Sequence, residues 1–264
     1  ETALSATCKE HNIGSFHHNI ESLHIVDNIS KHGHGMNLTF QVRDGIISHD
    51  GEVHNTKLIP ELDKTETDII KYIKTRKKGE YVSWMPATLE GCVVRISDTI
   101  AYIGQDIEDA IRFDILTRKE LPQDCADYLG YKNSDIVDTL VKSVILNSYE
   151  KNYIAFDKKT SYYLKKLKDF NYEKIYTNKD VKQIKGIITR SMRILFELYL
   201  EDLNRPNQNS KIFKHFLNHK SDYYKRTFSH PEKVRDFIAT MTDRYFNEEV
   251  QKYRVPGKFV NRNF

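Results

Sequence analysis

Apolar residues recur at helical spacing along most of the chain, and the longest run lies between residues 86 and 113. There the apolar side chains return every three or four residues for about seven turns. They are Leu89, Val93, Ile96, Ile100, Ile103, Ile107 and Ala110. No alternation of apolar and polar residues extends beyond a few positions, as a half-buried strand would require. The pattern therefore predicts an all-α protein.

Shorter runs with the same period predict the other helices, and turn residues separate them. The expected ranges are 16–31, 37–48, 65–78, 121–129, 133–151, 160–170, 180–203, 209–219 and 231–251. Pro86 suits a first helical turn and Asn37 can cap a helix, while Thr65 followed by Asp68 is a capping signal. Residues 49–64 are polar and irregular, which is typical of a functional loop.

Composition excludes several classes of protein. The chain has 264 residues, of which 39% are hydrophobic and 30% charged, so it can bury a substantial core. No apolar run approaches the 18 residues of a membrane span, and no signal peptide is evident. Three cysteines, Cys8, Cys92 and Cys125, lack any CxxC spacing. They argue against a disulfide framework or a zinc ribbon and favour a reducing, cytoplasmic setting.

The net charge of +4 conceals a division of the chain. Residues 151–264 contain 25 basic and 13 acidic side chains, whereas residues 1–150 contain 16 and 24. Eight of the 11 histidines lie between His11 and His54. This division suggests metal ligands in the first part and a polyanionic partner for the second, although two ordinary solvated surfaces would give the same counts.

Three side chains on the longest predicted helix form one candidate site. Asp98, Tyr102 and Asp106 are spaced i, i+4 and i+8, which places them within an arc of about 80° and about 12 Å along the axis. A carboxylate beside an apolar stripe requires a cation or several hydrogen bonds. A hard metal ligand, a stacking ring and an acceptor for a hydroxyl group would suit a nucleotide, whereas the alternative is an acidic solvent-exposed face.

A histidine cluster is the second candidate. His17, Glu21 and His24 share one face of the helix predicted over 16–31, and such a set could ligate zinc, although no HExxH motif is present. His18 points about 100° away and could act as an acid or base. Surface or core histidines remain the alternative for this group. The His49-Asp50 dipeptide lies in a loop and is not taken as a metal site.

Aromatic and basic residues interleave in two segments of the basic half, at 162–168 and 223–226. Such segments can hold bases and phosphates, and amphipathic helices have the same appearance. No Walker loop and no GxGxxG motif occurs, so a glycine-rich loop does not hold phosphates here.

Four stretches give the chain its resemblance to a known family. They read IGSFHHNIESLHIVDNI, MNLTFQVRDGIISHDGE, EGCVVRISDTIAYIGQDIEDAI and VRDFIATMTDRYF, and they extend from Ile13 to Phe246. The chain resembles the deoxyguanosinetriphosphate triphosphohydrolase (dGTPase) family of HD-domain dNTP hydrolases, and its clostridial-type members above all. The third stretch is the most specific, because it combines an aspartate, IAY and a second aspartate eight residues later.

The resemblance implies an all-α, HD-domain-like helical bundle with a C-terminal helical lobe. It also implies cleavage of a dNTP, dGTP above all, to a deoxynucleoside and tripolyphosphate with a divalent metal, Mg, Mn or Fe. Asp98 matches a metal ligand, Tyr102 the tyrosine that packs on the sugar, and Asp106 the carboxylate that accepts from the 3′-hydroxyl. His18 resembles the histidine that supports the catalytic acid.

The family's other metal ligands lie upstream of the region that this chain matches. The final glutamate of the family's GHxGE motif corresponds to Glu1, so we expect the chain to begin at the second member of a catalytic His/Glu pair and to lack three of four metal ligands. Residues 1–150 would then form part of the HD-type catalytic domain and 151–264 a basic C-terminal lobe. The family implies a cytoplasmic homo-oligomer that binds dNTPs. A non-catalytic module binding a nucleotide effector or single-stranded nucleic acid is the alternative.

Overall fold

The computed structural model describes residues 1–50 and 54–254 and confirms the all-α fold. Within these residues the strands are limited to β1 (Lys57–Leu58) and β2 (Ile154–Ala155), which pair antiparallel with Lys57 opposite Ala155. No helix in the described part is both long and apolar enough to cross a bilayer. The chain forms two compact units that are interleaved in sequence, and each has its own core.

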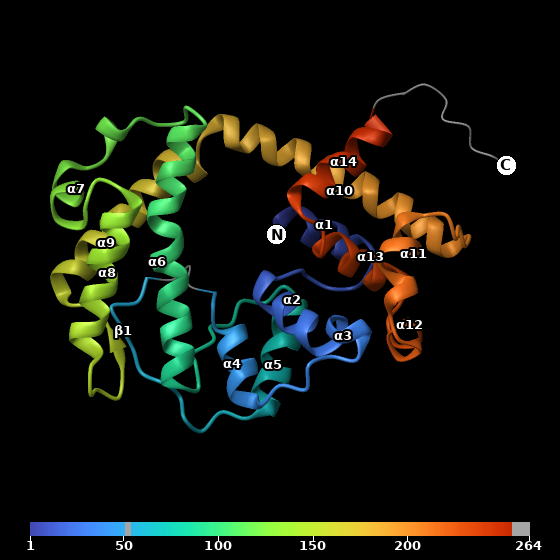
Figure 1. Ribbon diagram of the computed structural model, residues 1–264, viewed down its shortest axis with the longest axis horizontal. Helices are drawn as coiled ribbons and strands as arrows, with labels where there is room; N and C mark the ends of the chain where they lie inside the picture. Colours follow the sequence, from blue (N-terminus) through green and yellow to red (C-terminus); the bar gives the residue numbers. More distant parts are fainter. Residues whose placement is uncertain (51–53, 255–264) are drawn as a thin grey trace. The chain divides into compact units, whose positions relative to one another are not determined.

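One unit comprises residues 38–75 and 81–184. Its helices are α4 (Phe40–Ile47), most of α5 (Glu66–Lys77), α6 (Leu89–Arg112), α7 (Gln123–Leu129), α8 (Asn133–Ser148) and α9 (Lys158–Asn171). A 3-10 turn at Arg118–Glu120 and a π-helical turn at Tyr172–Tyr176 complete it. Its core gathers the buried face of α6 against α7, α8 and α9 (Figure 1).

Helix α6 confirms the strongest sequence pattern, with two differences. The helix begins after Pro86, because the Thr88 hydroxyl accepts from the Gly91 amide and caps it there. Val93 is 43% exposed, whereas the later members of the predicted stripe are buried. Gly104 permits a close approach of α8, since a Cβ atom at this position would lie 2.4 Å from Asn133 Oδ1.

The other unit comprises residues 1–37, 76–80 and 185–264, of which 255–264 lie outside the described residues. Its helices are α1 (Thr2–Glu10), α2 (His18–His24), α3 (Ser30–Gly33), most of α10 (Lys179–Asn204), α11 (Lys211–His215), α12 (Asp222–Thr227), α13 (His230–Ala239) and α14 (Asp243–Arg254). Leu4 and Cys8 of α1 pack in one apolar cluster with Val234, Phe237 and Ile238 of α13.

Three predicted helices of this unit are interrupted. The helix expected over 209–219 is divided into α11 and a 3-10 turn at Leu217–His219. The helix expected over 16–31 becomes a π-helical turn at Ile25–Ile29 and then breaks, since Lys31 and His32 adopt left-handed backbone angles. The helix expected over 231–251 is divided into α13 and α14, and the Thr242 hydroxyl accepts from the Tyr245 amide at the start of the second.

Two further sequence expectations differ from the structure. Asn37 does not cap α4, because its φ of +53° is left-handed and Thr39 occupies the cap position. The units also do not follow the change in charge near residue 150, since packing joins residues 1–37 to the C-terminal helices. The assignment of residues 1–150 to a catalytic domain stays a prediction.

Candidate active site

A carboxylate and a histidine meet where α1 and α2 begin. Glu1 is the N-cap residue of α1, and His18 is the first residue of α2. Glu1 Oε2 lies 2.5 Å from His18 Nδ1 and 3.3 Å from the His18 backbone nitrogen. The same carboxylate therefore contacts the imidazole ring and an amide at the start of α2, where an anion is favoured.

The ionisation of Glu1 fits this arrangement. Burial opposes the charge, but hydrogen bonds from His18 and the positive potential of the two adjacent histidines outweigh it and lower the pKa of the Glu1 carboxyl to about 2. An ionised carboxylate only accepts hydrogen bonds, so it selects the His18 form that carries a proton on Nδ1. The other ring nitrogen, Nε2, is then the atom that can accept or donate a proton toward a ligand.

His17 is held by different partners. Its Nδ1 lies 3.2 Å from Glu1 Oε1, and its Nε2 lies 3.0 Å from the carbonyl oxygen of Arg76. The Arg76 guanidinium also approaches His17 Nδ1 at 3.2 Å. His17 is thus a neighbour of the Glu1–His18 pair, and it is separate from Glu21 and His24, with which the sequence analysis grouped it.

A second candidate site lies on α6 in the other unit. Asp98, Tyr102 and Asp106 lie on one uninterrupted helix, as the spacing predicts. Tyr102 is 59% exposed, and the two aspartates are half-buried. Ile96, Ile100, Ile103 and Ile107 of the same helix are buried. The three side chains therefore follow the open side of α6, where a ligand could reach them.

Asp106 has a partner that the sequence analysis did not single out. The Tyr176 hydroxyl donates to Asp106 Oδ2, and Tyr176 closes the π-helical turn after α9. Burial raises the pKa of Asp106, while the hydrogen bond from Tyr176 partly opposes that rise. Near α6 the Asn171 amide donates to the Ile103 carbonyl at 2.9 Å and fixes the start of this turn. Tyr176 is therefore a further candidate for the site.

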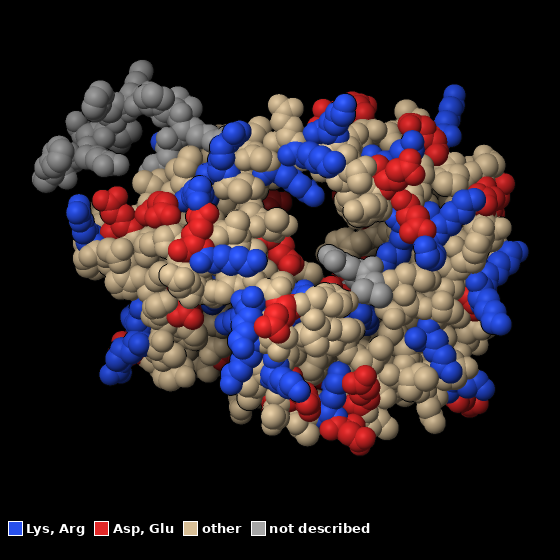
Figure 2. All heavy atoms as spheres, turned by 180° about the vertical axis from the view of Figure 1, so that it is seen from behind, with Lys and Arg blue, Asp and Glu red and all other residues tan. Residues whose placement is uncertain are grey.

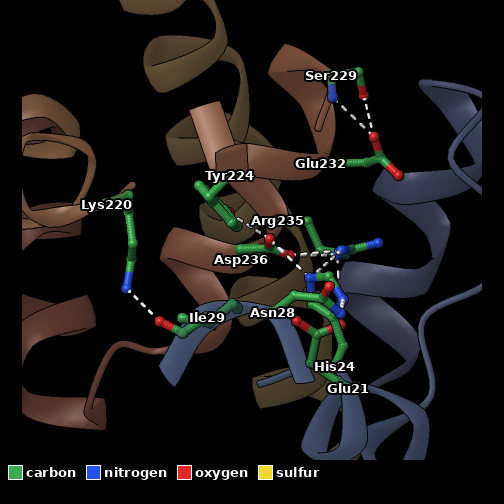
Figure 3. A network of polar contacts seen from close by, with 10 residues as sticks. All are labelled: Glu21, His24, Asn28, Ile29, Lys220, Tyr224, Ser229, Glu232, Arg235 and Asp236. Atoms are coloured by element: carbon green, nitrogen blue, oxygen red, sulfur yellow. Dashed lines mark hydrogen bonds and ion pairs between the residues drawn. The ribbon is translucent and has the colours of Figure 1, made fainter. Parts of the chain in front are cut away.

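A buried polar cluster lies on the inner side of α2 (Figure 3). Glu21, His24 and Asp236 offer ligand atoms within 4.8 Å of one another, and among the described residues they are the one such group of three. However, Arg235 already occupies this space: its Nη2 lies 2.6 Å from Asp236 Oδ1 and 3.2 Å from His24 Nε2. The guanidinium supplies the positive charge that a metal would bring, so the cluster does not fit a metal.

Asp98 fits a metal only in part. Its carboxylate is a hard oxygen ligand of the kind that divalent cations prefer. Within residues 1–50 and 54–252, however, it does not lie in a group of three such ligands. The described side chains thus supply one ligand for an ion and no complete coordination shell.

Charge is mixed over the surface of the molecule. On the face drawn in Figure 2, basic and acidic side chains are interspersed. Several lysines of the basic segment pair with neighbouring acids, including Lys165 with Asp169 and Lys166 with Asp124. The excess of basic residues after residue 151 therefore does not produce a uniform positive surface on this face.

Comparison with known proteins shows which families the whole chain resembles. Residues 154–252 match the model of a phosphohydrolase-associated domain. The chain is 30% identical over 250 residues to a deoxyguanosinetriphosphate triphosphohydrolase-like protein of Caldanaerobacter subterraneus, covering 95% of the chain and 61% of that protein. It is 31% identical over 235 residues to the protein of that name from Clostridium tetani, covering 87% and 57%.

A protein of the same name from Rickettsia akari is 27% identical over 288 residues, covering 94% of the chain and 68% of that protein. The chain spans about three fifths of the length of the first two relatives. The three relatives each align with most of the chain, and they share one name. Over most of its length the chain is therefore similar to proteins named deoxyguanosinetriphosphate triphosphohydrolase-like.

Proposed function

We propose that the protein is a dNTP triphosphohydrolase that releases a deoxynucleoside and tripolyphosphate from dGTP in preference to other dNTPs. The line of Asp98, Tyr102 and Asp106 along the open side of α6 carries this proposal. Its length of about 12 Å matches the distance from the phosphates to the sugar of a nucleotide. The names of the relatives support the same class of reaction.

Each residue of the line has a distinct role in the proposal. Asp98 is one ligand of a divalent cation, Mg, Mn or Fe, which when bound would polarise a phosphate and a water molecule. Tyr102 packs against the sugar, where its exposed ring offers an apolar face. Asp106 accepts from the 3′-hydroxyl, and the hydroxyl of Tyr176 keeps that carboxylate oriented.

The Glu1–His18 pair supplies the proton transfer. Glu1 holds the proton on Nδ1, so Nε2 of His18 can exchange a proton with the catalytic acid or the leaving group. Side chains with positive charge would complete the binding of the triphosphate. We propose a cytoplasmic homo-oligomer as the working form, in keeping with the family resemblance.

The test uses the native protein that contains this chain, incubated with dGTP and either Mg²⁺ or Mn²⁺. Intact tripolyphosphate, identified by ³¹P NMR, is the expected product, whereas phosphate or pyrophosphate would refute the proposed reaction. Asp98→Ala should abolish the release and lower the bound metal. Glu90→Ala is the matched control, because Glu90 is an exposed carboxylate on α6 that lies outside the arc of the line.

Retained activity in Asp98→Ala would refute the ligand assignment. Absence of hydrolysis, together with binding that weakens steeply as salt increases, would instead support a non-catalytic module for nucleotides or single-stranded nucleic acid.

A further inference from the structure

The orientation of His18 depends on a short helix. Helix α2 has seven residues and is followed directly by the π-helical turn at Ile25–Ile29. Isolated helices of this length are unstable in water, so tertiary contacts must hold α2 in place. The geometry of His18 against Glu1 is therefore determined by whatever contacts the rest of α2.

Two side chains of α13 make polar contacts to the inner face of α2. Asp236 Oδ2 lies 3.0 Å from His24 Nε2, and Arg235 Nε lies 3.4 Å from Glu21 Oε2. Glu21 is the third residue after His18, and His24 is the sixth. Figure 3 shows the side chains of both helices converging on the Arg235 guanidinium. One arginine and one aspartate of α13 thus engage two successive turns of α2.

The network is buried, and the charged forms of Asp236 and Arg235 are favoured within it. Asp236 is 0% and Arg235 4% exposed. Burial opposes the charge of Asp236, but hydrogen bonds from His24 and Tyr224 and the charge of Arg235 lower the pKa of its carboxyl to about 2. The Tyr224 hydroxyl donates to Asp236 Oδ2 at 2.5 Å. Buried charge pairs of this kind resist movement, because a displaced partner would leave an uncompensated charge.

The same helix also supports Glu1. Leu4 and Cys8 of α1 pack in the apolar cluster with Val234 and Phe237 of α13, and Glu1 is the N-cap residue of α1. The two members of the candidate acid–base pair are therefore attached to α13 by different means. Apolar packing holds the helix of Glu1, and the buried ion network holds the helix of His18.

We propose that Asp236, together with Arg235, is a positioning residue for the Glu1–His18 pair and holds α2 through His24 and Glu21. This inference rests on the proposed function for its effect on catalysis, but the effect on His18 can be measured without activity. Neither residue contacts a substrate in this scheme. Their contribution is to keep His18 Nδ1 within hydrogen-bond distance of Glu1.

The first experiment measures the tautomer of neutral His18 in the native protein by two-bond ¹H–¹⁵N correlation spectra. We expect His18 to carry its proton mainly on Nδ1, and Asp236→Asn to reduce that fraction at least by half. Glu249→Gln is the matched control. Glu249 is a buried carboxylate of the same unit, bound by Tyr199 and Lys211 and outside the α2 network.

A second background separates positioning from a simple change of electric field. In Glu1→Ala, Asp236→Asn should alter the tautomer no further, because the partner that selects it is already lost. Because Asp236→Asn could unfold the unit, Tyr224→Phe provides a milder variant that removes one hydrogen bond from the same carboxylate. An unchanged tautomer in folded Asp236→Asn, or an equal change in Glu249→Gln, would overturn the proposal.

The second experiment follows catalysis. Displacement of a reacting group by about 1 Å can cost on the order of 10²-fold in rate, so Asp236→Asn should lower kcat by that order with KM little changed. Equal losses in Asp236→Asn and Glu249→Gln would show a general effect on stability and refute positioning. If the unaltered protein cleaves no dNTP, the proposed function fails, and the tautomer measurement still decides this inference.

Discussion

Asp106 offers the sharpest test of how Asp98, Tyr102 and Asp106 on α6 would bind a substrate. If its carboxylate accepts from the 3′-hydroxyl, Asp106→Ala should impair cleavage of a dNTP far more than cleavage of the matching 2′,3′-dideoxynucleoside triphosphate. The dideoxy substrate lacks the donor, so it cannot lose that hydrogen bond. The ratio of kcat/KM for the two substrates therefore isolates one contact from general damage to the site.

The magnitude follows from the surroundings of Asp106. A hydrogen bond to a charged acceptor contributes about 1.5–3 kcal/mol, which corresponds to about 10- to 150-fold in kcat/KM. The carboxylate is half-buried, so solvent screens part of this interaction, and we expect the lower end of the range, about tenfold. Tyr176 already uses Oδ2, which leaves Oδ1 for the sugar.

The assay compares initial rates of tripolyphosphate release from dGTP and dideoxy-GTP for the unaltered protein, Asp106→Ala and Glu90→Ala. The tenfold selectivity should disappear in the first variant and persist in the second. Equal losses on both substrates would show that Asp106 supports the fold of α6 and does not bind the 3′-hydroxyl.

Three further outcomes follow from buried groups. Asp44→Ala should lower the free energy of unfolding by about 2–5 kcal/mol in urea titrations. The Asp44 carboxylate accepts from the indole N–H of Trp84 at 3.1 Å and from the Ala87 amide at 2.8 Å, and both donors would lose their acceptor. Asp44→Asn keeps an acceptor, so a loss as large as that of alanine would contradict this reason. The depressed pKa of Asp236 stabilises the fold above pH about 4, and this contribution is lost as the pH falls toward 2, so acid titration of Asp236→Asn should show a weaker dependence in that window. An unchanged acid transition would refute it. Burial raises the pKa of all three cysteine thiols, so a thiol reagent should label none of them rapidly before unfolding and all three afterwards, and rapid labelling of the native protein would argue against their burial.

The sequence predicts α6 well because seven turns of one apolar stripe are a strong signal, but its start is set by the Thr88 cap and not by Pro86. The division between α13 and α14 was harder to predict, since neither glycine nor proline marks it. The local signal was Thr242, which stands directly before an acidic residue. The Thr242 hydroxyl accepts from the Tyr245 amide at the start of the second helix.

In the candidate site, too, some contacts follow from a local sequence pattern and others do not. Asp98, Tyr102 and Asp106 share one helix, so their spacing alone predicts that they share a face. Tyr176 is 70 residues from Asp106 and reaches it from a π-helical turn, which no helical period predicts. The pairing of Glu1 with His18 agrees in geometry with the family resemblance, while the roles of both residues stay predictions.

The Arg235–Asp236 pair shows why some determinants of a site escape sequence analysis altogether. Two adjacent charged residues on a helix usually indicate a solvated face, and burial of both requires partners for each charge. Those partners, Glu21 and His24, lie more than 200 positions earlier. They belong to a helix that was predicted from its own apolar spacing, without reference to α13. Only the packed fold brings them together, and the same packing connects α13 to the histidine of the candidate acid–base pair. A buried charge more than 200 positions away from Glu1 and His18 should therefore control the proton transfer that we propose for this pair.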